Sequence, residues 1–217
     1  MSHFQSVLFD LDGTLVDTAP DLGFALNTLL EQEGRRPLAE ALIRPVASNG
    51  SRGLLALGFG IDASNPTFRP LQQRFIQLYQ DNLSRQSHVF PGMEAILAQL
   101  EQHAIPWGIV TNKPAFLTDP LCEQLKLSSR AACIVSGDTT PYCKPHPAPL
   151  LHGCNLLAVS AQHSLYIGDA ARDIEAGKRA HMTTIAARYG YIEADEDPAS
   201  WQADGIIDHP DELSQWL

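Results

Sequence analysis

The feature that most limits the fold of this chain is an alternation of helical and extended apolar runs from residue 90 onward. Apolar residues that recur every three or four positions predict helices, and short runs rich in β-branched and aromatic residues predict strands. Such an alternation is typical of βα units, which build a mostly parallel sheet covered on both faces. The sequence therefore predicts an α/β fold with a Rossmann-like, doubly wound parallel sheet. The predicted helices lie around residues 96–100, 117–125, 147–157, 171–180 and 210–216, and the predicted strands at 107–111, 133–135, 164–167, 184–187 and 206–207.

The first strand of this sheet is predicted much earlier, at residues 6–9, where an apolar run is bounded by Gly13. Between residues 17 and 86 the apolar residues follow helical spacing, as in the runs 22–30 and 68–83, and no convincing strand is expected. We therefore expect an α-helical insertion at residues 17–86. The α/β core would consist of residues 1–16 and 87–217.

Charge and cysteine content argue against several classes of protein. The formal net charge of −10, without a cluster of Lys and Arg, disfavours nucleic acid as a partner, because phosphate backbones are bound by clustered cations. The four cysteines have no CxxC spacing, so reduced cysteines are expected rather than a disulfide frame or a zinc site. Neither a signal sequence nor a run of membrane-spanning length is seen, so a cytoplasmic protein without a membrane partner is expected. A monomer and a homodimer fit the sequence equally.

Two acidic residues, Asp10 and Asp12, follow the first strand and precede Gly13 and Thr14. Side chains two positions apart in an extended segment point the same way, so both carboxylates can face a ligand beyond the end of the strand. Two negative charges this close are unfavourable unless a cation neutralises them or one of them carries a proton. The pair therefore indicates a metal site, an acid/base pair or both, and a crowded surface turn is the alternative without a function.

Further polar residues follow the later strands of the predicted sheet. Thr111 and Asn112 end one strand, Lys144 lies in the loop after the next, and Asp169 ends a third, with Asp173 four residues later. Open parallel sheets bind ligands at the carboxyl ends of their strands, where the connections diverge to opposite faces. We therefore expect these side chains to meet the two acids of the first strand in one small volume.

Phosphoryl transfer is the chemistry that such a group of side chains suits. A phosphate monoester needs fixed donors and cations for its oxygens, a metal that offsets charge, and a nucleophile in line with the leaving oxygen. Carboxylate and carbonyl oxygens favour Mg²⁺. An aspartate can act as a covalent nucleophile while a second carboxyl acts as acid and then as base, and Asp10 and Asp12 are the obvious pair.

In their order along the chain, these polar residues resemble the four motifs of the haloacid dehalogenase superfamily of phosphatases. The helical insertion is similar to the small α-helical cap of the phosphoglycolate phosphatase-like branch. Within that branch, the segments 88–93, 110–114 and 188–192 resemble the N-acetylmuramic acid 6-phosphate phosphatases. The segments that carry the superfamily resemblance are Asp10-x-Asp12-Gly13-Thr14, Thr111-Asn112, Lys144-Pro145 and Gly168-Asp169-x-x-x-Asp173.

The resemblance implies a role for each carboxylate. Asp10 would attack phosphorus and become an aspartyl phosphate, and Asp12 would protonate the leaving oxygen and later activate water. Asp10, the main-chain carbonyl of Asp12 and Asp169 would hold Mg²⁺. Asp173 would orient these ligands or a metal-bound water. The acid at Asp12 also argues against dehalogenation, because carbon–halogen cleavage produces no oxyanion that needs a proton.

The resemblance further implies that Thr111, Asn112 and Lys144 bind the transferring phosphoryl group, with Lys144 as a compact cation. Arg52, in a polar loop of the insertion, is the best candidate for a substrate contact, and a solvated surface arginine is the alternative. Ala170 departs from the pattern, because relatives often carry a polar residue there. This departure is expected to remove an auxiliary hydrogen bond and to leave the metal ligands intact.

The expected function is a Mg²⁺-dependent phosphatase of a small phosphorylated metabolite, with N-acetylmuramic acid 6-phosphate as the first candidate substrate and 2-phosphoglycolate as the second. A sugar phosphomutase of the same superfamily would instead pass the phosphoryl group back to a sugar hydroxyl. A signalling receiver domain uses similar residues, but the helical insertion and the acid at Asp12 argue against it. A non-catalytic protein that binds phosphorylated metabolites would have lost the nucleophile or the lysine, and this chain retains both.

Overall fold

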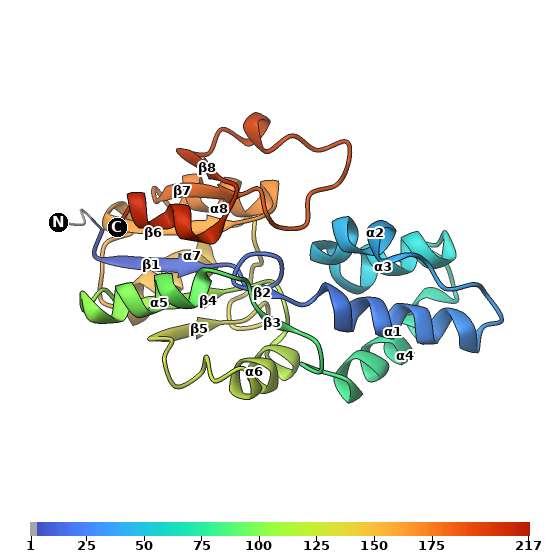
Figure 1. Cartoon of the computed structure of the whole chain (residues 1–217). Coiled ribbons are helices and arrows are strands. Elements are labelled where there is room, and N and C mark those ends of the chain that lie inside the picture. The colour runs from blue at the N-terminus through green and yellow to red at the C-terminus, as the bar shows by residue number, and fades with distance from the viewer. Residues whose placement is uncertain (1–3) are drawn as a thin grey trace.

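The computed structural model describes residues 4–217, so residues 1–3 of the expected core segment 1–16 lie outside the described residues. Its centre is a sheet of six parallel strands in the order β5-β4-β1-β6-β7-β8 (Figure 1). The predicted α/β fold with a parallel sheet is confirmed. The strands of this sheet are β1 (Ser6–Phe9), β4 (Trp107–Val110), β5 (Cys133–Val135), β6 (Ser164–Gly168), β7 (Thr183–Ala187) and β8 (Gly205–Ile207).

Helices cover both faces of the sheet, which is why its strands read as nearly continuous apolar runs. They are α5 (Met93–Gln102), α6 (Ala115–Gln124), α7 (Ala148–Leu156), α8 (Ala171–Arg179) and the 3₁₀ helices η2 (Ala161–His163), η3 (Pro198–Trp201) and η4 (Pro210–Gln215). Side chains alternate along β1, so Val7 and Phe9 join the apolar cluster with α5 and η4, whereas Leu8 joins the cluster with α7 and α8. The sheet is therefore wound on both sides, as predicted.

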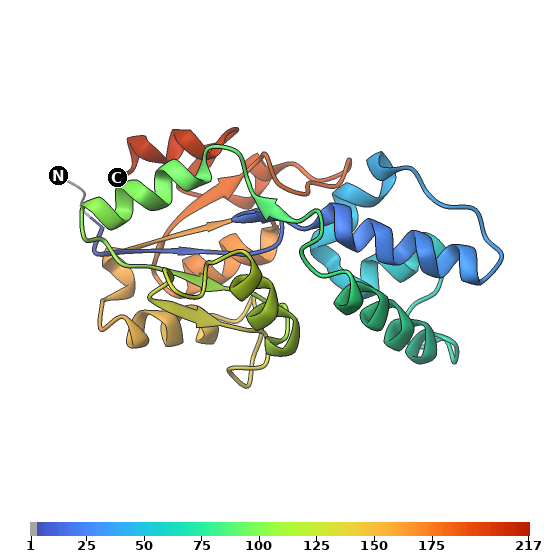
Figure 2. The same ribbon diagram turned by 60° about the horizontal axis from the view of Figure 1, so that its bottom comes forward.

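A group of helices lies beyond the carboxyl ends of the strands, and both views show it beside the sheet (Figures 1 and 2). Helix α1 contacts α3 and α4 in this group, and the contacts are apolar. Leu26, Leu54 and Phe75 are among its buried residues. We call it the helical group; its members are α1 (Ala19–Gln32), α2 (Glu40–Ile43), the 3₁₀ helix η1 (Arg44–Asn49), α3 (Gly50–Phe59) and α4 (Phe68–Asp81).

One local prediction is wrong. Asp17 was expected to begin a stretch without strands, but it lies in β2 (Val16–Asp17), which pairs antiparallel with β3 (His88–Val89). Strands of two residues are too short to show an alternating pattern. The predicted helix at residues 210–216 is confirmed, as the 3₁₀ helix η4, whose first turn contains Pro210.

Asp21 ties together the two connections between the sheet and the helical group. Its carboxylate is 1% exposed and accepts hydrogen bonds from the main-chain N–H groups of Gln86, at 3.1 Å, and Ser87, at 2.8 Å. The Ser87 hydroxyl donates to the same carboxylate at 2.6 Å. The start of α1 and the returning chain at residues 86–87 are therefore held side by side.

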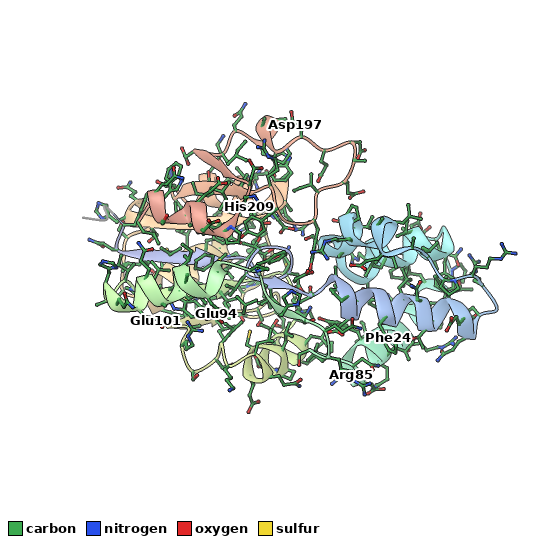
Figure 3. The ribbon with its side chains drawn as sticks, viewed as in Figure 1. Phe24, Arg85, Glu94, Glu101, Asp197 and His209 are labelled. Atoms are coloured by element: carbon green, nitrogen blue, oxygen red, sulfur yellow. The ribbon has the colours of Figure 1, made fainter. Side chains whose placement is uncertain are left out.

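On the outer surface, Arg130 pairs with Glu94 at 2.8 Å and with Glu101 at 2.9 Å, and both glutamates lie on α5 (Figure 3). Its guanidinium also lies 5.9 Å from the centre of the Trp107 ring. Exposed ion pairs contribute about 1 kcal/mol or less each, so the fold does not depend on them.

The cysteines of the chain are free, and Cys143 is the exposed one among them. Within residues 4–217, no helix has both the length and the apolar character that crossing a membrane requires.

Candidate active site

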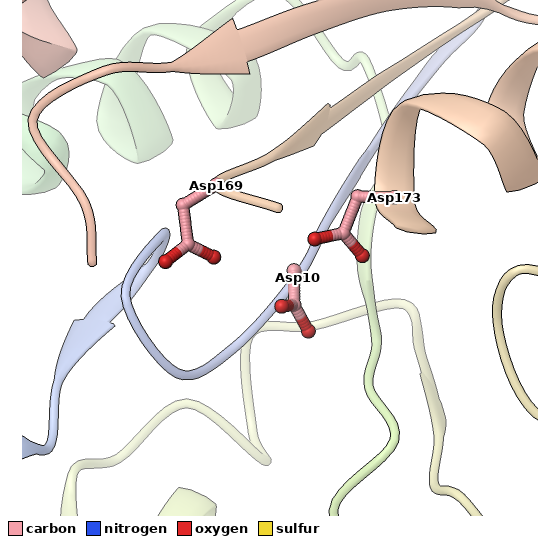
Figure 4. Close-up of side chains that lie close together, drawn as sticks. All are labelled: Asp10, Asp169 and Asp173. Carbon is pink, nitrogen blue, oxygen red and sulfur yellow. The ribbon is translucent and has the colours of Figure 1, made fainter. Parts of the chain in front are cut away.

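Three buried carboxylates converge at the carboxyl ends of β1 and β6 (Figure 4). Asp10 follows β1, Asp169 follows β6, and Asp173 lies in the first turn of α8. One oxygen of each carboxylate lies within 4.8 Å of the others. The structure brings these residues together because β1 and β6 are neighbours in the sheet. We call Asp10, Asp169 and Asp173 the acidic cluster.

The turn after Asp10 depends on glycine at residue 13. Gly13 has a φ of +85°, and a Cβ atom there would lie 2.1 Å from Oδ2 of Asp169. The close approach also brings Thr14 within reach, and its hydroxyl donates a hydrogen bond of 3.2 Å to Asp169 Oδ1. Gly13 therefore allows the loop after β1 to pack against the end of β6.

One buried cation, Lys144, lies among these carboxylates. Its Nζ is 2.8 Å from Asp10 Oδ1 and 2.7 Å from Asp173 Oδ1. It donates hydrogen bonds to the Val110 carbonyl at 2.9 Å and to the Tyr166 hydroxyl at 2.8 Å. Lys144 is only 3% exposed. One ammonium therefore faces the acidic cluster, which leaves an excess of negative charge.

Burial and this excess charge make two of the carboxyls weaker acids. Burial raises the pKa of Asp10 to about 6, although the neighbouring Lys144 acts to lower it. Burial, together with the charges of Asp10 and Asp173, raises the pKa of Asp169 to about 7. Both carboxyls hold a proton more tightly than an ordinary aspartate, mainly because burial removes the water that would solvate their ionised forms.

The same oxygens fit a hard divalent cation. Asp10 Oδ1 is buried, and within residues 4–217 its one charged contact is the Lys144 ammonium, 2.8 Å away. Asp169 supplies a second carboxylate, and the Asp12 carbonyl lies 3.4 Å from the Ser48 hydroxyl that also contacts Asp169. Carboxylate and carbonyl oxygens are the ligands that Mg²⁺ prefers, so this set of donors suits the ion.

The carboxylate of Asp12 lies outside the acidic cluster. Its Oδ1 accepts a hydrogen bond of 2.6 Å from the Thr18 hydroxyl and lies 2.8 Å from Lys113 Nζ. The Asp12 side chain is 15% exposed, so it is more open to solvent than Asp10. An accessible carboxyl beside a buried one matches the division between a proton donor and a nucleophile.

Thr111 and Asn112 follow β4, on the side of β1 opposite β6. The Thr111 oxygen accepts the Lys113 N–H at 3.1 Å, which leaves its own proton available for a ligand. The Asn112 amide accepts the Lys144 N–H and donates to the Lys144 carbonyl, both at 2.9 Å. Asn112 therefore fixes the lysine loop, and its direct contact with phosphate stays a prediction.

Asp173 also holds the start of α8. Its Oδ2 accepts the Ala170 N–H at 3.1 Å, and its Oδ1 accepts the Tyr166 hydroxyl at 3.2 Å. Ala170 has no side-chain oxygen that could cap the helix. The Asp173 carboxylate satisfies the main chain here instead, so the departure at Ala170 leaves this turn intact.

The 3₁₀ helix η1 of the helical group contacts the acidic cluster. The Ser48 hydroxyl donates a hydrogen bond of 2.8 Å to Asp169 Oδ2. Arg172 of α8 donates to the Ser48 carbonyl at 2.8 Å and to Asn49 Oδ1 at 3.3 Å. Arg52, the predicted substrate contact, is exposed on α3 and makes no hydrogen bond or ion pair within residues 4–217.

Tyr191 joins Asp169 to the beginning of α1. Its N–H donates to Asp169 Oδ2 at 2.9 Å, and its hydroxyl donates to Asp17 Oδ1 at 2.7 Å. The hydroxyl also accepts the N–H groups of Thr18, at 2.7 Å, and Ala19, at 2.8 Å. It thereby satisfies donors at the start of α1 that have no partner inside the helix.

Similarity to known proteins assigns the chain to a family. The sequence profile described as haloacid dehalogenase-like hydrolase matches residues 7–187. The chain belongs to this family of haloacid dehalogenase-like hydrolases. It is 40% identical over 211 residues to the N-acetylmuramic acid 6-phosphate phosphatase of Pseudomonas aeruginosa, which covers 97% of this chain and 93% of the relative. It is 42% identical over 210 residues to the phosphoglycolate phosphatase of Xanthomonas campestris pv. campestris, which covers 96% and 94% respectively.

Solved structures of haloacid dehalogenase-like hydrolases share the fold. A crystal structure described as "a predicted phosphoglycolate phosphatase" from Haemophilus somnus has a TM-score of 0.87, at 26% identity. The match covers 99% of this chain and 98% of that chain. The prediction of a phosphatase of the haloacid dehalogenase superfamily is confirmed.

Sequence patterns do not single out three residues that the structure places at the site, namely Lys113, Ser48 and Arg172. Lys113 directly follows Thr111-Asn112, and Arg172 lies between the two acids of the last motif, so both positions carried a signal. Ser48 lies in η1, a stretch whose sequence shows no periodic pattern, and only the structure reveals its contact with Asp169.

Proposed function

We propose that this phosphatase hydrolyses a small phosphorylated metabolite with Mg²⁺, through a covalent aspartyl phosphate on Asp10. The position of the Asp10 carboxylate carries the proposal. It is buried at the end of β1, 2.8 Å from the Lys144 ammonium and close to Asp169. A nucleophile in this position faces fixed positive charge, which can stabilise the phosphoryl group as it is transferred.

The proposed reaction has two steps. In the first, an Asp10 oxygen attacks phosphorus and the bond between phosphorus and the ester oxygen breaks, while Asp12 gives its proton to that oxygen. In the second, Asp12 takes a proton from a water molecule that attacks the phosphorus of the aspartyl phosphate. The bond between phosphorus and the Asp10 oxygen breaks, which releases inorganic phosphate and restores the Asp10 carboxylate. Asp12 then carries its proton again.

Asp10, Asp169 and the main-chain carbonyl of Asp12 are the proposed ligands of Mg²⁺. When bound, the ion supplies positive charge that offsets the charge of the phosphoryl group. Asp173 is engaged at 2.7 Å by Lys144 and also holds the start of α8. We assign it a supporting role, in which it keeps the lysine and this turn in place.

Lys144 and Thr111 are the proposed contacts of the phosphoryl oxygens. Both side chains are buried. Thr111 directly follows β4, which pairs with β1, and Lys144 lies in the loop after β5 with its ammonium 2.8 Å from Asp10. Lys144 supplies a compact cation, and the Thr111 hydroxyl supplies a donor. Asn112 supports this site through its two hydrogen bonds to the Lys144 main chain.

We further propose that residues 17–86 act as a cap on the core formed by residues 1–16 and 87–217. The helical group lies at the carboxyl ends of the strands, and its Ser48 reaches Asp169. A closed cap excludes bulk water and completes the set of side chains around a substrate. Arg52 is exposed on the helix that follows η1, so it stays a candidate for the substrate contact.

N-acetylmuramic acid 6-phosphate is the proposed substrate, and 2-phosphoglycolate is the second candidate. Relatives named for these two activities are 40% and 42% identical to this chain over nearly its whole length, which supports both candidates about equally. The resemblance of residues 88–93, 110–114 and 188–192 to the first group favours the amino sugar phosphate.

Phosphate release from the two candidate substrates, measured side by side with Mg²⁺, tests the proposal. We expect inorganic phosphate to be released and EDTA to stop the release. Asp10→Asn is expected to abolish turnover, and wild-type turnover by this variant would contradict the assignment of the nucleophile. Accumulation of an isomeric sugar phosphate without phosphate release would instead indicate a phosphomutase.

A further inference from the structure

The carboxyl group of Asp12 is anchored through one of its two oxygens. Oδ1 accepts the Thr18 hydroxyl at 2.6 Å and the Lys113 ammonium at 2.8 Å. Within residues 4–217, no donor pairs with Oδ2. Two donors on Oδ1 restrict rotation of the carboxyl group, so Oδ2 keeps one orientation and stays available to carry a proton.

Lys113 is nearly buried, with 7% of its side chain exposed. Its Nζ also donates to the Tyr79 hydroxyl at 3.0 Å and lies 4.6 Å from the centre of that ring. The Asp12 carboxylate and the Tyr79 hydroxyl are the polar partners of this ammonium within residues 4–217. A buried ammonium carries a desolvation penalty that an apolar side chain would avoid. A role in holding the Asp12 carboxyl group therefore explains the buried lysine at residue 113 better than a role in packing does.

Tyr79 connects this arrangement to the helical group. It lies on α4 and is 1% exposed. Asp12 and Lys113, in contrast, belong to the loops that follow β1 and β4. The hydroxyl of Tyr79 accepts a hydrogen bond from Lys113, so the anchor of Asp12 includes a residue from each part.

We propose that Lys113 is a positioning residue for proton transfer by Asp12, and that Tyr79 makes this positioning depend on the docked helix α4. The inference rests on the proposed role of Asp12 as acid and base. Lys113 acts through Asp12, because its ammonium holds Oδ1 and thereby directs Oδ2 toward the leaving oxygen. Its contribution to the first step is therefore confined to leaving groups that need a proton.

Two esters with the same nitroaromatic ring separate this role from a general effect on structure. p-Nitrophenyl phosphate releases a stable phenolate, whereas p-nitrobenzyl phosphate releases an alkoxide that must be protonated. For each ester, kcat/KM reports the steps up to the first cleavage of the phosphorus–oxygen bond. Because general acids contribute about 10²–10⁴-fold, we expect Lys113→Met to lower kcat/KM about tenfold more for the benzyl ester than for the phenyl ester. Tyr79→Phe is expected to show the same preference at about threefold.

Asp12→Asn is the reference variant, and Lys178→Met, which changes an exposed lysine of α8, is the matched control with no expected effect. Equal losses on both esters in Asp12→Asn would overturn the proposed role of Asp12 itself. A selective loss in Asp12→Asn with equal losses in Lys113→Met would overturn the positioning role alone.

Tyr79→Phe keeps the aromatic ring and the lysine, so it also serves if circular dichroism shows that Lys113→Met does not fold. In that case the ratio of the two kcat/KM values in Tyr79→Phe decides the question. A ratio unchanged from that of the wild type would overturn the link between α4 and Asp12.

Discussion

The Ser48 hydroxyl donates a hydrogen bond of 2.8 Å to Oδ2 of Asp169, which joins the helical group to the acidic cluster. The Tyr191 N–H donates to the same oxygen at 2.9 Å. A metal ion bound through this oxygen competes with the serine hydroxyl for it. If the proposed metal binds this oxygen, the helical group and the metal would share one ligand atom.

Ser48→Ala removes this competitor, so Mg²⁺ is expected to bind the variant about fivefold more tightly, which corresponds to the net loss of one hydrogen bond of about 1 kcal/mol. Isothermal titration calorimetry of the metal-free protein measures the change. Ser214→Ala, on η4, is the control with unchanged affinity. Weaker binding by Ser48→Ala would show instead that the hydroxyl holds Asp169 in the geometry of a ligand.

The raised pKa values of Asp10 and Asp169 predict how the stability of the metal-free protein depends on pH. Both carboxyls bind a proton more tightly in the folded protein than at their ordinary pKa of 3.8. The stability that this protonation contributes is therefore present at low pH and is lost as the pH rises from about 4 to about 7. In EDTA, we expect the ionisation of these two residues to make the melting temperature fall as the pH rises from about 5.5 to about 8.

Mg²⁺ is expected to raise the melting temperature more at about pH 8 than at about pH 5.5, because protons compete with the ion for the carboxylates at the lower pH. Asp169→Asn cannot ionise at this position. In EDTA, its melting temperature should therefore change much less between about pH 5.5 and about pH 8 than that of the wild type. Mg²⁺ should also stabilise it much less. A pH difference equal to that of the wild type in this variant would contradict the assignment to Asp169.

Lys144→Met leaves Asp10 and Asp173 buried without the ammonium that contacts both. Breaking a buried ion pair by removal of one partner costs about 3–5 kcal/mol in the free energy of unfolding. Urea denaturation in EDTA at neutral pH measures this loss, and turnover should fall about 10²–10³-fold or more. Unchanged stability would show that the two carboxyls take up protons instead.

Arg172→Met removes the donor to the Ser48 carbonyl and to Asn49. Because Arg172 contacts the helical group, we expect KM to rise about fivefold with little change in kcat, the pattern of lost uniform binding. Arg179→Met, which changes an exposed residue of the same helix, is the matched control. A lower kcat with an unchanged KM would place Arg172 in the chemical step instead.

The sequence predicts that Asp10, Thr111 and Asp169 lie close together, because each follows a predicted strand and parallel strands end at the same edge of a sheet. Each of these residues directly follows an apolar run that reads as a buried strand. The alternation of helical and extended apolar runs also predicted the sheet and the helices that cover it. These predictions succeed because burial imposes a period on the sequence.

Contacts between separate elements leave no such period. The ion pair between Lys113 and Asp12 depends on the paths of two loops, and the hydrogen bond of Lys113 to Tyr79 depends on where the helical group lies relative to these loops. The two hydrogen bonds of Asn112 to Lys144 depend on the path of a loop. The cytoplasmic location, the oligomeric state and the role of Arg52 stay predictions.

The chain leaves the sheet through β2 and returns through β3, and these strands pair with each other while Asp21 holds Ser87 at 2.8 Å. The helical group is therefore attached through one double connection. The strand pairing and the hydrogen bond of Asp21 hold these two connecting segments side by side, so they are expected to move as one unit. If the helical group closes as the proposed cap, a hinge of this kind would return Ser48 to Asp169 and Tyr79 to Lys113.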